Sequence, residues 1–143
     1  MSVSGLPELD AWMKAYQRKA DAGVRKEITR TANAIRNRVM DSMRAPASGI
    51  VYIRKPGQNL SRQHTASAPG DAPAKDSGAL VRSIAYKRPS PMQATVSSDI
   101  EYAARLEYGD MRVQARPSFR PATDAERGPF EEAIREAMRR AAE

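Results

Sequence analysis

The sequence predicts an α+β fold: a small antiparallel sheet of three to four strands, packed by a long N-terminal helix and a C-terminal helix, with a long projecting loop. Two apolar patterns of helical period, one near each end of the chain, predict the helices. Short runs of β-forming residues between them predict the strands. The 143 residues fit a single domain. Its expected parts are a long helix over 7–45, an extended loop or arm over 46–76, a helix–sheet core over 77–122 and a C-terminal helix over 123–143.

The long N-terminal helix is predicted by a proline in its first turn, two acidic residues at its positive end and an apolar stripe. Gly23 interrupts the stripe and marks a kink or a close contact with another element. The part after Gly23 packs on the protein's own sheet or extends away from it. The part before it is expected to meet a neighbouring subunit. The stripe consists of Trp12, Tyr16, Ala20, Val24, Ile28, Ile35, Val39 and Met43.

The loop over 46–76 begins at Pro46 and is rich in turn-forming glycine and proline. Within it, residues 50–54 form a short β-like run, which the turn at 55–57 could return as a second arm near Leu60. A loop this long in a small domain is usually functional or disordered. Its basic residues could contact DNA phosphates without reading the sequence, or they could simply keep the loop solvated. These candidates are Arg54, Lys55, Arg62 and Lys75.

The core segment opens with a short helix that Asp76 or Ser77 is expected to cap, with Leu80 and Ile84 buried against the sheet. The β-like runs 83–88 and 93–98 follow, joined by the rigid connection 89–91.

A second short helix is predicted over 100–108, with Asp99 as its cap and Gly109 as its end. The run 111–116 alternates enough to predict a further strand. The last helix is expected over 129–142 with Pro129 at its first position. Its apolar face consists of Phe130, Ala133, Ile134, Ala137 and Met138.

Composition argues against several classes of function. There are no cysteines, which excludes disulfides and thiolate zinc sites. Neither a signal peptide nor an apolar run long enough to span a bilayer is present, so a soluble, cytoplasmically made protein without membrane contact is expected. The net charge of +7 and the pI near 10.0 suggest nucleic acid, yet the basic residues are dispersed, with no run of like charge.

Residues for catalysis are scarce, and we expect neither an enzyme nor a bound metal or cofactor. The single histidine, His64, lies in the polar loop and is expected to make a loop contact or to have no role. Four carboxylates near one another in sequence could suggest a metal site, but capping and ion pairing account for them equally well. These are Asp99, Glu101, Glu107 and Asp110.

Three segments resemble, in order, motifs of the neck and tail-completion proteins of long-tailed bacteriophages. They are 67–84 (SAPGDAPAKDSGALVRSI), 102–109 (YAARLEYG) and 115–122 (ARPSFRPA). Two departures from the family pattern stand out. Ser118 is inserted between Pro117 and Phe119, and Gly128-Pro129 interrupts a C-terminal helix that is normally continuous.

The resemblance implies a structural protein of the virion neck, assembled in the bacterial host cytoplasm. It would form a homo-oligomeric ring of six or twelve copies that completes or terminates the tail, or closes the head, and contacts other neck, connector or tail-tube proteins. Genomic double-stranded DNA would pass through the ring. Within it, Glu107 is expected to pair with Arg116 or Arg120 of the same or the next subunit. The expected interface residues are Trp12, Tyr16, Glu107, Tyr108, Arg116, Phe119 and Arg120.

One rival interpretation is a sequence-nonspecific DNA-binding protein, favoured by the high pI. Its test is salt-dependent binding of duplex DNA by the isolated subunit. A small hydrolase or nuclease is the other rival, and the absence of cysteine and of a second histidine argues against it.

Overall fold

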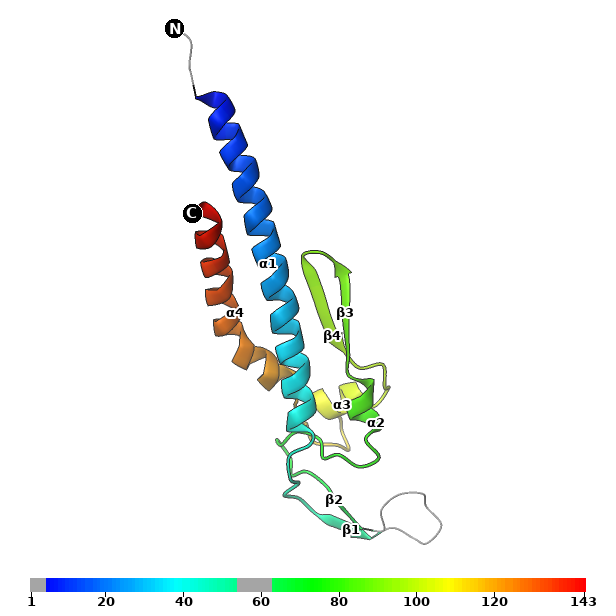
Figure 1. Ribbon diagram of the computed structural model, residues 1–143. Helices are drawn as coiled ribbons and strands as arrows, with labels where there is room; N and C mark the ends of the chain where they lie inside the picture. Colours follow the sequence, from blue (N-terminus) through cyan, green and yellow to red (C-terminus); the bar gives the residue numbers. More distant parts are fainter. Residues whose placement is uncertain (1–4, 54–62) are drawn as a thin grey trace.

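The structure is a computed structural model that describes residues 5–53 and 63–143 (Figure 1). It is a mixed helix and strand fold, which confirms the α+β class. The elements in chain order are α1 (Leu6–Ser42), β1 (Val51–Ile53), β2 (Gln63–Thr65), α2 (Ala79–Ser83), β3 (Ala85–Ser90), β4 (Gln93–Ser97), α3 (Ala103–Tyr108) and α4 (Phe119–Ala142).

Helix α1 is the axis of the molecule and agrees closely with the prediction for 7–45. It begins after Gly5, whose φ of 112° suits a residue without a side chain, and it carries proline in its first turn. Its 37 residues extend about 55 Å at ~1.5 Å per residue. Helix α4 packs along one side of α1, while β3 and β4 pack along another (Figure 1).

Helix α4 runs antiparallel to α1, because Arg38 pairs with Glu126 near one end while Gly23 faces Ala137 near the other. A Cβ atom at Gly23 would lie 3.1 Å from the Ala137 Cβ, so Gly23 allows the two helix backbones to approach closely. Of the two alternatives predicted for Gly23, the close contact is therefore confirmed.

The predicted start of the last helix at Pro129 is wrong. Helix α4 begins ten residues earlier, at Phe119, and Pro129 lies inside it. A proline in a helix removes one hydrogen bond and bends the axis without necessarily ending the helix, and α4 is visibly bent in Figure 1. The earlier start has its own cause, which is a carboxylate from α3 described below.

The predicted sheet of three to four strands is also wrong. The strands of the described ranges form two separate antiparallel pairs, β1 with β2 and β3 with β4. In the second pair Ala85 lies opposite Ser97 and Tyr86 opposite Val96. Strand β3 continues through Pro89 after a register irregularity, where a proline is tolerated, so the connection is shorter than the predicted 89–91.

Residues 111–116, predicted as a strand, form no strand. The Asp110 carboxylate accepts hydrogen bonds from the backbone N–H groups of Arg112 and Val113, at 2.7 and 2.8 Å. Such a turn diverts backbone donors from any ladder. The segment instead lies against α3 and the loop around Gly70, whose N–H donates to the Ala115 carbonyl at 3.0 Å.

The hydrophobic core lies where the second half of α1 meets α2, β4 and the first turns of α4. Ile84 is only 2% exposed, as predicted, whereas Leu80 is half-buried and its neighbour Val81 is the buried residue of α2. The long stripe of α1 thus packs on the protein's own elements after Gly23. The buried cluster is Val39, Met43, Val81, Ile84 and Ala122, with Ile35, Met40, Leu80, Val96 and Phe119 packed against it.

The ends of the two short helices differ in part from prediction. Helix α2 starts after Gly78, and the Ser77 hydroxyl accepts the Ala79 N–H at 3.3 Å, while Asp76 is not its cap. Helix α3 starts after Tyr102 rather than at the predicted Asp99. Its end at Gly109, with φ of 74°, is confirmed.

The hydropathy of the described helices bears on the membrane question. None of them combines the length and the apolar character that a bilayer-spanning segment needs.

Candidate subunit-interface site

The three sequence motifs meet in space, although they are separated along the chain. The Gly70 N–H of the first motif donates to the Ala115 carbonyl of the third at 3.0 Å. The Arg116 N–H of the third donates to the Leu106 carbonyl of the second at 2.6 Å. The motifs therefore build one local structure at the C-terminal end of α1.

Glu107 joins the second and third motifs through its carboxylate. Its two oxygens accept backbone N–H groups from Ser118 (2.7 Å), Phe119 (3.0 Å) and Arg120 (2.8 Å). These amides belong to the first turn of α4, which leaves its N–H groups without partners inside the helix. A negative charge at this end also suits the helix dipole. Glu107 therefore caps α4 from outside the helix and fixes its start.

The predicted pairing of Glu107 with an arginine is not found within the subunit. Among residues 5–53 and 63–143, neither Arg116 nor Arg120 forms an ion pair with it. Arg120 instead places its guanidinium 6.0 Å from the ring centroid of Tyr108, at the outer limit of a cation–π contact. Tyr108 is exposed and Phe119 packs on the core. Their predicted interface roles, and the pairing of Glu107 between subunits, stay predictions.

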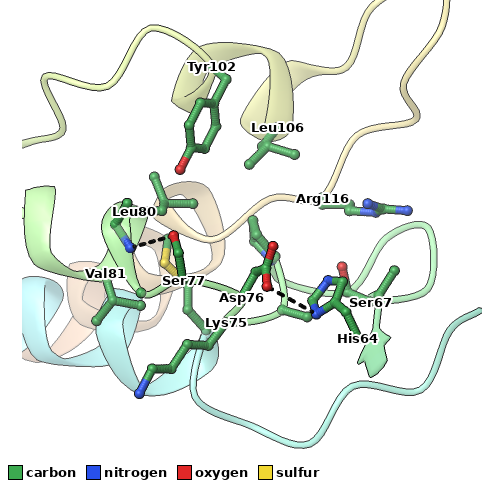
Figure 2. Close-up of a pocket in the computed structure, with 16 residues that line it drawn as sticks. His64, Ser67, Lys75, Asp76, Ser77, Leu80, Val81, Tyr102, Leu106 and Arg116 are labelled. Carbon is green, nitrogen blue, oxygen red and sulfur yellow. Dashed lines mark hydrogen bonds and ion pairs between the residues drawn. The ribbon is translucent and has the colours of Figure 1, made fainter. Parts of the chain in front are cut away.

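A pocket of about 290 Å³ opens where the first two motifs and Arg116 meet (Figure 2). Leu80 and Val81 of α2 and Leu106 of α3 form apolar parts of its wall. The hydroxyl end of Tyr102 points into it, and the side chain of Lys75 is directed away from its centre (Figure 2). The pocket is mainly apolar on this side.

The other side of the pocket contains two buried polar atoms without a hydrogen-bond partner in the described chain, Ser67 Oγ and Arg116 Nε. Ser67 is only 4% exposed. A buried donor without an acceptor costs free energy, so each of these atoms calls for an acceptor from outside the chain, such as a water, an ion or another molecule. Sequence reasoning identified Arg116 from the motif but gave no signal for Ser67.

The predicted interface residues Trp12 and Tyr16 lie at the opposite end of the molecule. Ala20 and Ala141 are buried where α4 ends, and α1 continues beyond that point in Figure 1. We call residues 6–16 the free end of α1. Trp12 is 53% exposed and stacks on Tyr16, with ring centroids 5.6 Å apart. The exposed apolar side chains of this free end also include Leu6, Leu9 and Met13.

A second exposed apolar group, which sequence reasoning did not identify as a surface, lies on the β1–β2 hairpin. Ile53 is 76% exposed, and all three residues of β1 are exposed. An isolated two-stranded hairpin is at best marginally stable in water. The hairpin is therefore a further candidate for contact with another chain. Its exposed residues are Ile50, Val51, Tyr52 and Ile53.

The predicted DNA-facing residues are placed only in part. Arg54, Lys55 and Arg62 lie outside the described residues. Lys75 is exposed, and its backbone N–H donates to the Met43 carbonyl at 3.0 Å, which ties the loop to the end of α1.

Three of the residues considered for catalysis, His64, Glu107 and Asp110, have local partners. His64 Nδ1 lies 3.7 Å from a carboxylate oxygen of Asp76, consistent with a loop contact. Glu107 caps α4, and Asp110 binds its own turn. In the described ranges, no three acidic or histidine side chains are grouped so that they could hold a metal ion.

The hydrogen-bonded turn at Asp110 predicts how the carboxyl of this residue titrates. Hydrogen bonds from the Arg112 and Val113 N–H groups hold the pKa of its carboxyl below the ordinary value, because they favour the charged form. The contribution of the Asp110 carboxylate to stability is therefore present above its pKa in the unfolded chain. It is lost as the pH falls through the lower pKa that this group has in the folded chain. In an NMR titration we expect the Asp110 carboxyl to protonate at lower pH than an ordinary aspartate side chain. A pKa at or above the ordinary value would contradict this hydrogen-bonded turn.

Comparisons with known proteins give no family for this chain. No protein-family model matches it, and no curated protein or solved structure matches it with significance.

Proposed function

We propose that the chain is a structural subunit of the neck of a long-tailed bacteriophage. Copies would form a homo-oligomeric ring at the head-to-tail junction, where the ring completes or terminates the tail or closes the head. Double-stranded DNA would pass through its centre. The proposal includes no catalytic activity and no cofactor. It places the protein in the virion, in contact with other neck, connector or tail-tube proteins.

The free end of α1 is the observation that best supports an assembling subunit. Every residue from Gly5 to Lys14 is exposed, and four of them are large apolar residues. A short helix is marginally stable in water without packing, and exposed apolar patches mark interaction surfaces. A partner that covers this face would stabilise both the helix and the assembly.

The meeting of the three motifs is a second source of support. Their residues form a pocket and a helix cap, and so the resemblance falls on one local structure instead of scattered turns. The free end of α1 and the helices α2 and α3, which line this pocket, lie at opposite ends of α1 (Figure 1). Two different patches on one subunit form a head-to-tail contact, which closes into a ring when the rotation permits.

Trp12→Ala tests the role of the free end. Because Trp12 is exposed and distant from the core, we expect unchanged subunit stability but at least about tenfold weaker self-association, as for a central aromatic of an interface. Sedimentation and electron-microscope class averages would measure it. Met92→Ala, at another exposed apolar residue, should leave assembly unchanged. Rings that form equally well with both variants would contradict the role of Trp12.

A nonspecific DNA-binding protein remains the second candidate, because the net charge is +7. Many basic side chains on α1 and α4 are nevertheless in ion pairs with acids of the same helix, such as Arg25 with Asp21 and Arg140 with Glu136. This pairing reduces the positive field of both helices. Strong, steeply salt-dependent binding of duplex DNA by the monomer would favour this candidate over the ring.

A further inference from the structure

The pocket offers an apolar wall beside an arginine, and its lining also includes Asp76, which lies 3.7 Å from His64 Nδ1. Leu80, Val81 and Leu106 supply apolar walls, and the volume of about 290 Å³ holds one or two aliphatic side chains. At its rim Arg116 is in no ion pair with any described residue, and its Nε lacks an acceptor. The buried Ser67 hydroxyl adds a second free donor. A carboxylate satisfies both kinds of donor, and arginine binds it with particular strength.

One segment of the chain offers such a pair of groups. Glu8 lies in the first turn of α1 between Leu6 and Leu9, all of them exposed. In the part of the chain that the structure describes, Glu8 forms no ion pair. The other acidic residues of α1 each contact a basic residue three or four positions further along the chain, in the pairs Asp10–Lys14, Asp21–Arg25, Glu27–Arg30 and Asp41–Arg44. Glu8 is thus the acid of α1 that is available to another chain.

A subunit cannot bring its own Glu8 to its own pocket. Glu8 lies in the first turn of α1, whereas Met43, the residue after its last turn, lines the pocket. The two are therefore separated by about 50 Å at ~1.5 Å per residue. The donor must therefore be a second copy.

We propose that the free end of α1 of one copy docks on the pocket of the next copy, with the Glu8 carboxylate against Arg116 and a leucine of the same turn among Leu80, Val81 and Leu106. The proposal rests on the ring proposed above, and it names which two surfaces join. Each copy then gives its helix end and receives another, which is the head-to-tail arrangement that a ring requires.

Charge reversal tests this pairing. Glu8→Arg and Arg116→Glu, made singly, should each weaken self-association at least about tenfold, because like charges then face each other. The double variant should regain association to within a few-fold of the wild-type chain. Asp124→Arg is the matched control, since it makes the same charge change on α4 away from both surfaces and should have no effect. Sedimentation equilibrium measures all four, and circular dichroism verifies that each is folded.

Cysteine pairs provide a second measurement that does not depend on how well Arg116→Glu folds. The natural chain has no cysteine. In the double variant Glu8→Cys and Arg116→Cys, a short bismaleimide should therefore link copies into a series of covalent oligomers on a denaturing gel. The double variant Glu8→Cys and Thr123→Cys should give no linked copies. Thr123 lines a different, apolar groove between α1, β4 and α4.

The outcomes separate this inference from the ring itself. If the wild-type chain associates, but the charge reversals do not weaken its association and residue 8 does not cross-link to residue 116, the docking is wrong. The proposed ring is unaffected by that result. Links from residue 8 to residue 123 would place the helix end in the other groove and would also overturn the docking. If the wild-type chain stays monomeric at all concentrations and gives no cross-links, both proposals fail.

Discussion

Replacing Ile84 by alanine should lower the free energy of unfolding by about 2 to 5 kcal/mol, the largest effect that we expect from a single substitution in the core. Ile84 is 2% exposed and follows α2, where it packs in one cluster with Val39 of α1 and with Met43, the residue directly after that helix. Its loss would leave a cavity where helix, hairpin and loop meet. Urea denaturation followed by circular dichroism measures the change.

Two nearby substitutions provide a comparison for the loss of stability expected of Ile84→Ala. Leu80→Ala should cost less than Ile84→Ala, because Leu80 is only half-buried and lines the pocket. Lys75→Ala should leave stability almost unchanged, since its side chain is exposed and the backbone hydrogen bond to Met43 remains. Equal effects at Ile84 and Leu80 would contradict the difference in burial between these two side chains.

Glu107→Ala should lower stability by about 2 to 3 kcal/mol. The carboxylate is the acceptor for three N–H groups at the start of α4, and a charged acceptor of this kind exceeds an ordinary cap. The first turn of α4 contributes Phe119 and Ala122 to the core, so its loosening should affect the whole fold. Thermal and urea denaturation measure the loss.

The controls for Glu107 separate capping from assembly. Glu107→Gln retains one carbonyl acceptor and should recover part of the stability, while the exposed Glu101→Ala should change little. If Glu107→Ala leaves the melting temperature unchanged and only prevents ring formation, then its role is at the interface, as the sequence alone predicts, and the cap is energetically minor.

Both long helices and the end of α3 at Gly109 were predictable because their signals are local. Helical spacing of apolar residues is a pattern among neighbours in the sequence. A glycine that ends a helix is recognised in the same way, from the few residues before it. The extent of α1 from Leu6 to Ser42 follows from such a pattern. The burial of Ile84 follows from periodicity as well.

The errors concern residues whose state depends on distant partners. Pro129 resembles a helix start, but Glu107 holds the start of α4 at Phe119, and helix packing carries α4 through the proline. Residues 111–116 alternate like a strand, yet Asp110 binds their amides and no partner strand is supplied. Local propensity is overridden by tertiary contact in each case.

The candidate site was predictable only as a set of motifs. The sequence identified Glu107 but assigned it to Arg116 or Arg120, because charge complementarity is visible in a sequence while free backbone amides are not. Ser67 carries no recognisable signal, since its importance arises from burial without a partner.

The projection of α1 beyond α4 makes the helix a rod of fixed length between the two proposed contact surfaces. Because no described element packs around residues 6–14, adding or removing turns there would leave the core untouched and change only the reach of the rod. Seven residues, close to two turns, alter that reach by about 10 Å and keep the same face toward the partner. In a closed ring, the length of the free end would determine the distance between neighbouring copies and therefore the circumference. The size of the central opening would then depend on the number of helical turns in the free end.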